Sequence, residues 1–207
     1  LGICVGLLFC CLITKSKADD HIDFIMDRIY VGDQYAAANL YELQHTYNVS
    51  AILNVAWDLD LRYSLENYTG SIEDDNEHLN LQYSKVGLVD GTGNIPAMLI
   101  SAMITLHQFL TPRNLESKDQ NTYPQPVQNV LVHCHSGHSR SVTVAALYLY
   151  YTQPDIFRNY EEALLFVKSK RGVLTDPSVP EPPLNLLAHQ VASTFHSTNC
   201  SQLFQFI

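Results

Sequence analysis

The chain has 207 residues, of which 46% are hydrophobic and 16% are charged. This balance suits one globular domain with its own core and excludes a wholly disordered chain. Twelve basic residues against 21 acidic ones leave a net charge of -9, which excludes a general binder of nucleic acid or anionic lipid, because such affinity comes from neutralised phosphates. Five cysteines, three of them in the first eleven residues, do not form a disulfide framework, so a reducing compartment is expected for the folded part.

The first residues form an apolar leader that we set apart as residues 1–20. Residues 1–13 carry no charge, and Lys15 and Lys17 follow them. The run is shorter than the roughly 20 residues of a membrane span. Three interpretations stay open: a truncated signal peptide cleaved after Ala18, the tail of a membrane anchor, or misassigned coding sequence. We expect a cytoplasmic protein, membrane-anchored or secreted if the leader is real, and any membrane association to run through the leader alone.

The rest of the chain alternates between strand-like and helix-like segments. Asp33 is a helix cap, and continuous apolar runs at 50–56 and around Val130–Val132 are typical of strands buried on both faces of a parallel sheet. Residues 57–80 are acidic and predict a solvated loop, with a substrate-facing lid as the alternative. In chain order we expect strands at 28–31, 50–56, 81–88 and 128–133, and helices at 33–47, 95–110, 139–151, 159–171 and 184–195.

This alternation predicts an α/β fold in which helices flank a central, mostly parallel sheet. The folded domain is assigned to residues 21–207, with an insertion loop at about 112–129 that holds three prolines and many polar residues. The insertion connects a helix to a strand, and such connections lie at the amino ends of the strands. Ligands bind beyond the carboxyl ends, so we expect the insertion to leave the functional site intact.

A segment rich in reactive and polar side chains follows the Val130–Val132 strand. It reads HCHSGHSRS, from His133 to Ser141, and it leads into the 139–151 helix. A loop at a helix N-terminus gathers backbone N–H groups into an anion site, and Gly137 allows a turn that a side chain would block. Arg140 offers a planar fork for two phosphate oxygens. The same positive field favours thiolate over thiol at Cys134 and so predicts a nucleophile.

The spacing is specific enough to outweigh two plainer interpretations. A bare Cys-x5-Arg is a weak signal, but the preceding His133 and the intervening Gly137 make chance occurrence rare. The plainer interpretations are a buried structural cysteine and a metal site made of His133, Cys134, His135 and His138. Adjacent residues of one tight loop cannot all converge on one ion, so we expect no metal and no cofactor.

The loop VHCHSGHSRS resembles the signature of the protein tyrosine phosphatase superfamily, in particular its dual-specificity branch. The resemblance extends over residues 24–195, since IYVGDQYAAANLYELQHTYNVSAILNVA is similar to the opening strand, helix and second strand, and KVGLVDGTGN to the general-acid segment. It implies a hydrolase that dephosphorylates phosphotyrosine and phosphoserine/threonine through a phosphocysteine intermediate. The implied catalytic residues are Cys134 as nucleophile, Arg140 as phosphate clamp, Asp90 as general acid and Ser141 as assisting hydroxyl.

The remaining members of the implied phosphate-binding loop are His133, His135, Ser136, Gly137, His138 and Ser139. We expect His133 to orient the loop through hydrogen bonds, and His135 and His138 to be exposed. Asp74, Asp75 and Asp176 rival Asp90 as the acid; the first two precede their strand and so lie at its other end.

The expected partner is a phosphoprotein substrate, the expected state a monomer. Two alternatives remain open: a relative acting on phosphoinositides or RNA 5′-phosphates, which the absence of lysine in the loop disfavours, and a phosphate-binding pseudoenzyme.

Overall fold

The computed structural model describes residues 21–61, 81–111 and 129–197. Five strands form one sheet in the order β1-β2-β5-β3-β4. Strand β1 (Ile22–Met26) pairs antiparallel with β2 (Ile29–Gly32), and all other pairs are parallel. Strand β5 (Asn129–His133) lies between β2 and β3 (Val49–Ala56), and β4 (Gln82–Leu88) lies at the far edge. The expected α/β fold with a mostly parallel sheet is confirmed.

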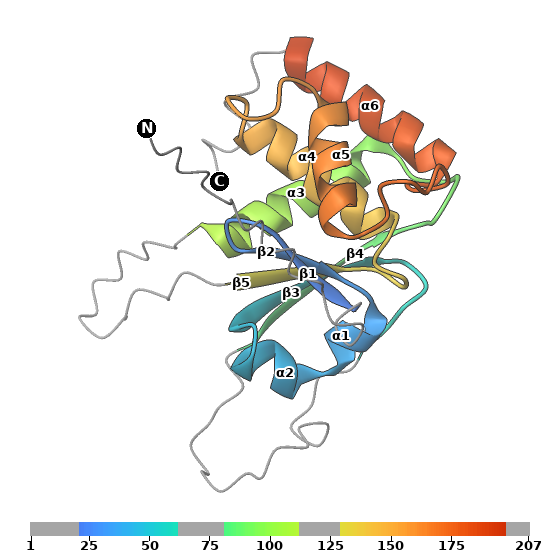
Figure 1. Ribbon diagram of the computed structural model, residues 1–207. Helices are drawn as coiled ribbons and strands as arrows, with labels where there is room; N and C mark the ends of the chain where they lie inside the picture. The colour runs from blue at the N-terminus through green and yellow to red at the C-terminus, as the bar shows by residue number, and fades with distance from the viewer. Residues whose placement is uncertain (1–20, 62–80, 112–128, 198–207) are drawn as a thin grey trace, which may run out of the picture.

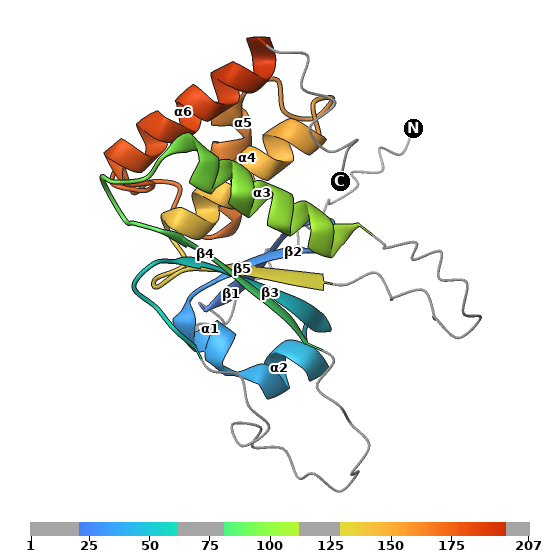
Figure 2. The same ribbon diagram turned by 180° about the vertical axis from the view of Figure 1, so that it is seen from behind.

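Helices cover both faces of this sheet (Figures 1 and 2). One face carries α1 (Gln34–Ala38) and α2 (Leu40–His45). The other carries α3 (Pro96–Leu110), α4 (Arg140–Thr152), α5 (Tyr160–Lys170) and α6 (Pro182–Ser197). Within the residues that the structure describes, no helix is long and apolar enough to cross a membrane.

The central strand β5 shows why the sheet is buried on both faces. Successive side chains of a strand point to opposite faces. Accordingly Val130 and Val132 belong to the large core under α3–α6, whereas Leu131 belongs to the smaller core under α1 and α2. All three are fully buried, and burial of each stabilises the fold by about 1.5–3 kcal/mol. The continuous apolar run therefore forms a strand buried on both faces of the sheet, as the sequence predicted.

Two local features differ from the sequence predictions. The single helix expected from Asp33 to Tyr47 is wrong, because Asn39 ends α1 and caps α2 through a hydrogen bond that its side chain accepts from the Glu42 backbone N–H. Asparagine competes in this way with continued helix. Strand β1 was not predicted at all: its sequence IDFIM places an acidic residue among apolar ones, and only pairing with β2 gives it strand structure.

The remaining predicted helices and strands agree with the structure to within a few residues. Helix α6 begins at Pro182, two residues earlier than expected, in keeping with the tolerance of proline in a first turn. The leader, residues 62–80 of the acidic stretch and residues 112–128 of the insertion lie outside the described residues. The insertion's flanks, Leu110 and Asn129, are the end of α3 and the start of β5.

Candidate active site

The loop between β5 and α4 occupies the carboxyl end of the central strand. Strand β5 ends at His133, α4 begins at Arg140, and residues 134–139 connect them. Gly137 adopts φ 72°, and a Cβ atom there would lie 2.6 Å from the Gly32 carbonyl oxygen. The position therefore needs glycine both for its backbone conformation and for the close approach to β2. The turn predicted around Gly137 is present.

Carbonyl groups of this loop are tied to the surrounding protein. The His135 carbonyl accepts a hydrogen bond of 3.1 Å from the Gln34 backbone N–H, and the Gly137 carbonyl accepts one of 3.1 Å from Arg171 Nε. Arg171 is itself held by a buried ion pair of 2.5 Å with Asp23 of β1. Backbone N–H groups of residues 135–139 donate no hydrogen bond to any residue that the structure describes. These N–H groups are therefore available to a ligand, as the anion site predicted from the sequence requires.

Cys134 lies at the base of the loop and is fully buried. Its Sγ is 3.3 Å from the Oγ of Ser141, which lies in the first turn of α4 and is also buried. A serine hydroxyl at this distance can donate to a thiolate. His133 Nδ1 is 3.2 Å from the Cys134 carbonyl oxygen, which can only accept, so Nδ1 is the protonated ring nitrogen. Burial lowers the pKa of His133 to about 4, so the ring is neutral near pH 7 and contacts the backbone of the loop.

The Arg140 side chain is only 3% exposed and meets three groups of neighbouring strands. Its Nη1 donates to Asp58 Oδ1 at 2.5 Å and to the Leu88 carbonyl at 3.3 Å, and its Nη2 is 3.6 Å from Asp90 Oδ2. Nε is buried and makes no hydrogen bond to the described part of the chain. Burial by itself lowers the pKa of Arg140, but the Asp58 hydrogen bond and the nearby charges of Cys134 and Asp90 raise it overall.

Asp58 is the site residue that sequence reasoning missed, because it was counted within the solvated 57–80 loop. The hydrogen bond from Arg140 lowers the pKa of Asp58, so its carboxylate stays charged. Asn54, fully buried in β3, donates to the Leu59 carbonyl at 2.9 Å and accepts from the Ala56 N–H at 2.9 Å. These bonds hold the backbone on both sides of Asp58. An acidic residue directly after a buried parallel strand was the available signal.

The predicted general acid lies where the sequence placed it, on the loop after β4. Asp90 is within ion-pair distance of Arg140. Asn94 holds this loop in a compact turn: its side chain accepts from the Val89 N–H and donates to the Val89 carbonyl, both at 2.8 Å, and to the Gly91 carbonyl at 3.2 Å. Sequence analysis identified the turn but not Asn94 as its organiser.

Of the rival acids, Asp176 alone lies among the described residues, and it is not paired with Arg140. Asp176 accepts hydrogen bonds from the backbone N–H and the hydroxyl of Ser178 at 2.9 and 2.6 Å, and these bonds lower the pKa of Asp176. A carboxyl held in its ionised form is a poor general acid. Asp74 and Asp75 lie outside the described residues.

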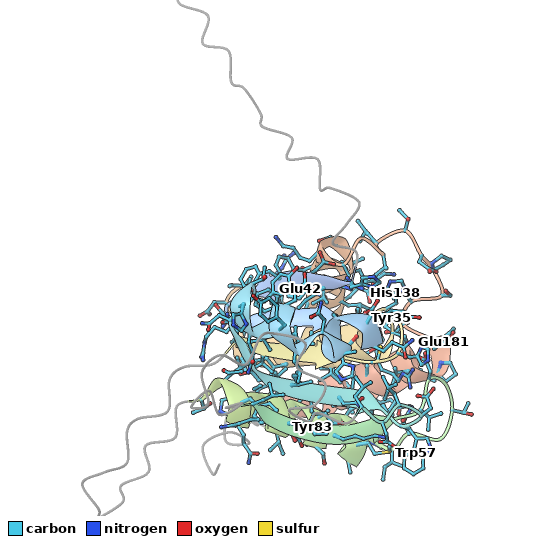
Figure 3. All side chains as sticks on the ribbon, turned by 90° about the horizontal axis from the view of Figure 1, so that it is seen from below. Tyr35, Glu42, Trp57, Tyr83, His138 and Glu181 are labelled. Carbon is cyan, nitrogen blue, oxygen red and sulfur yellow. The ribbon has the colours of Figure 1, made fainter. Side chains whose placement is uncertain are left out.

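The other loop side chains differ in exposure, and His138 is labelled in Figure 3. His135 and Ser136 are exposed, as expected for His135, whereas His138 is half-buried rather than exposed. Burial, followed by the charge of Arg171, lowers the pKa of His138. Ser139 is buried and accepts a hydrogen bond of 3.1 Å from the Glu181 N–H. No group of three or more His, Cys, Asp or Glu in residues 21–61, 81–111 and 129–197 is arranged to hold a metal ion.

Comparison with known proteins rests on structure. No family model matches the chain, and no curated protein sequence matches it. Among solved structures, human DUSP28 is similar with a TM-score of 0.60 and 16% identity, covering 84% of this chain and 95% of that one. The Yvh1 phosphatase domain from Chaetomium thermophilum gives a TM-score of 0.62 and 18% identity, covering 87% and 98%. DUSP15 gives a TM-score of 0.61 and 14% identity, covering 89% and 92%.

These neighbours have in common the architecture that the loop motif implied, and each is covered almost completely. At such low identities the likeness concerns the path of the backbone, and the residues of the site must be argued from their own geometry. The chain therefore has the fold of these solved structures, which are dual-specificity phosphatases.

Proposed function

We propose that the protein is a cysteine-dependent protein phosphatase that hydrolyses phosphotyrosine and phosphoserine/threonine through a phosphocysteine intermediate. The observation that carries the proposal is the unused edge of Arg140. Its buried Nε has no acceptor among the described residues, and its Nη2 is 3.6 Å from Asp90, beyond a hydrogen bond. A buried unpaired donor such as Nε costs about 1–3 kcal/mol, and a bound phosphate could accept from Nε with one oxygen and from Nη2 with another.

The first step follows from the position of Cys134 under the loop. Its thiolate attacks phosphorus, an S–P bond forms, and the P–O bond to the leaving group breaks. Loop N–H groups and Arg140 hold the phosphoryl oxygens, whose charge the loop field stabilises. Asp90 acts as the general acid and donates a proton to the leaving oxygen. The immediate products are the free alcohol or phenol, phosphocysteine and an Asp90 carboxylate.

The second step uses the same groups in reverse roles. The Asp90 carboxylate accepts a proton from water as that water attacks phosphorus, and the S–P bond breaks. Ser141 lies 3.3 Å from Cys134 Sγ, so its hydroxyl can donate to the thiolate as it departs. Inorganic phosphate is released, and the two residues return to their starting protonation states.

Turnover tests this proposal directly. Wild-type protein is assayed on para-nitrophenyl phosphate, phosphotyrosine and phosphoserine peptides, phosphoinositides and RNA 5′-phosphates. We expect hydrolysis of the aryl phosphate and of both peptide classes, and for Cys134→Ser a loss of at least about a thousandfold, the order seen when a nucleophile is removed. Ser141→Ala should slow only the second step, so it should show a burst of phenol release followed by slow turnover.

Three results would contradict the proposal. Cys134→Ser activity within tenfold of wild type would exclude the nucleophile. Faster hydrolysis of phosphoinositides or RNA 5′-phosphates than of every peptide would indicate an enzyme whose substrates are not proteins. Binding of phosphate without turnover of any substrate would indicate a pseudoenzyme.

A further inference from the structure

A recess lies on the face of the sheet that α1 and α2 cover. It has a volume of about 210 Å³. His21, Tyr35, Asn39, Glu42 and Tyr47 line it together with apolar residues that are buried. Whole ligands usually occupy pockets of about 300–1,000 Å³, so this one suits a single side chain.

Backbone contacts place this pocket next to the proposed catalytic site. Tyr35 follows Gln34, whose N–H donates to the His135 carbonyl of the phosphate-binding loop. Figure 3 shows Tyr35 on the side toward His138, with Glu42 farther along the α1–α2 surface. A peptide that leaves the loop across α1 would therefore reach this pocket.

The carboxylate of Glu42 in this pocket favours a positively charged ligand. Glu42 Oε2 accepts a hydrogen bond of 2.8 Å from Asn39, and no cation of the described residues pairs with this carboxylate. The neighbouring His21 is bound to Asp33 at 2.6 Å, so it offers Glu42 no compensation. Tyr35 is 64% exposed and presents an aromatic ring at the rim. An unpaired carboxylate beside tyrosine rings attracts a cation and disfavours an anion.

We propose that this pocket binds a lysine or arginine side chain of a phosphoprotein substrate, a few residues from the phosphorylated residue. The proposal rests on the proposed phosphatase function and assigns that function a substrate class. The aliphatic stem of the basic side chain would pack on the apolar lining, and its charged end would meet Glu42 and the tyrosine rings.

A lysine scan tests the proposal. Phosphotyrosine peptides with an otherwise neutral sequence carry one lysine at each of the four positions on either side of the phosphorylated residue. We expect kcat/KM to rise by about threefold to tenfold at one or two adjacent positions, the combined size of a half-exposed ion pair and a cation–π contact. Glu42→Gln should abolish that increase and leave para-nitrophenyl phosphate hydrolysis unchanged, since glutamine also completes the cap with Asn39.

Two controls separate this site from general attraction by the acidic chain. Glu161→Gln removes a half-exposed carboxylate from α5, on the other side of the sheet, and should leave the lysine preference intact. Tyr35→Ala should reduce the preference while Glu42 remains. A lysine effect of equal size at every position, or one that Glu161→Gln lowers as much as Glu42→Gln does, would overturn the proposal.

Failure of the phosphatase proposal gives a different result. The same peptides are titrated into Cys134→Ser protein, and binding is measured by fluorescence anisotropy. If no substrate is turned over but the lysine peptides still bind more tightly in a manner that depends on Glu42, the pocket stands and the catalytic proposal fails. If turnover is normal and no lysine position is preferred, the pocket proposal alone is wrong.

Discussion

Asp58 offers the sharpest test of how the site is built, because it contacts Arg140 and belongs to no part of the loop motif. Asp58→Asn keeps an oxygen acceptor for Arg140 Nη1 at the observed 2.5 Å but removes the charge. A hydrogen bond to a charged group contributes about 1.5–3 kcal/mol. Since the Asp58 side chain is 56% exposed, water screens it, and we expect the lower end: about a tenfold loss of kcat/KM. Asp58→Ala, which removes the acceptor too, should lose up to about a hundredfold.

The assay is para-nitrophenyl phosphate hydrolysis, with vanadate inhibition as a measure of phosphate binding. The hydrogen bond from Arg140 lowers the pKa of Asp58. The Asp58–Arg140 ion pair is therefore fully formed above the ordinary aspartate pKa of about 3.9, and its stabilisation is lost only as the pH falls through the lowered pKa. Measurements near neutral pH therefore report the charged form. Asp60→Asn is the matched control, since Asp60 pairs with Lys85 instead. Equal losses in Asp58→Asn and Asp60→Asn would refute the reasoning.

Three further predictions concern the acid, the loop support and pH. Asp90→Asn should lower kcat by about 10²–10⁴ on a phosphoserine peptide and much less on para-nitrophenyl phosphate, whose leaving group needs little protonation; equal losses on both would assign Asp90 a structural role. Asp23→Asn removes the negative charge that pairs with buried Arg171 and should destabilise the protein by about 3–5 kcal/mol in urea unfolding, while Glu162→Gln, at an exposed pair with Arg158, should change little. Burial lowers the pKa of His133 to about 4, so between about pH 6.5 and 4 the unfolded chain binds a proton that the folded protein does not. The free energy of unfolding should therefore decrease as the pH is lowered through this range. His133→Gln should flatten that slope by up to about 1.4 kcal/mol per pH unit, and an unchanged slope would show that His133 does not titrate as inferred.

The turn between β5 and α4, which we propose binds phosphate, was predictable from sequence because its geometry is local. Cys134, Gly137, Arg140 and Ser141 lie within eight consecutive positions, and a strand that runs directly into a helix allows few backbone paths between them. The position of Asp90 was predictable for a related reason: it lies just after strand β4, and parallel strands present their carboxyl ends at one edge of the sheet. In both cases neighbours along the chain supply the constraint.

The supporting contacts join segments that are far apart in the chain, and only the tertiary structure decided them. Asp58 and Arg140 are separated by 82 positions, and Asp23 and Arg171 by 148. No periodicity or composition states which carboxylate meets which arginine, because that depends on strand order and on the side of the sheet to which each connection returns. The break between α1 and α2 at Asn39 depends on both local and distant contacts. Its hydrogen bond to Glu42 is local, but the two short helices also pack on the sheet through the smaller core. Sequence thus determined which residues the loop carries and where it lies, and the assembled sheet determined which distant side chains contact it.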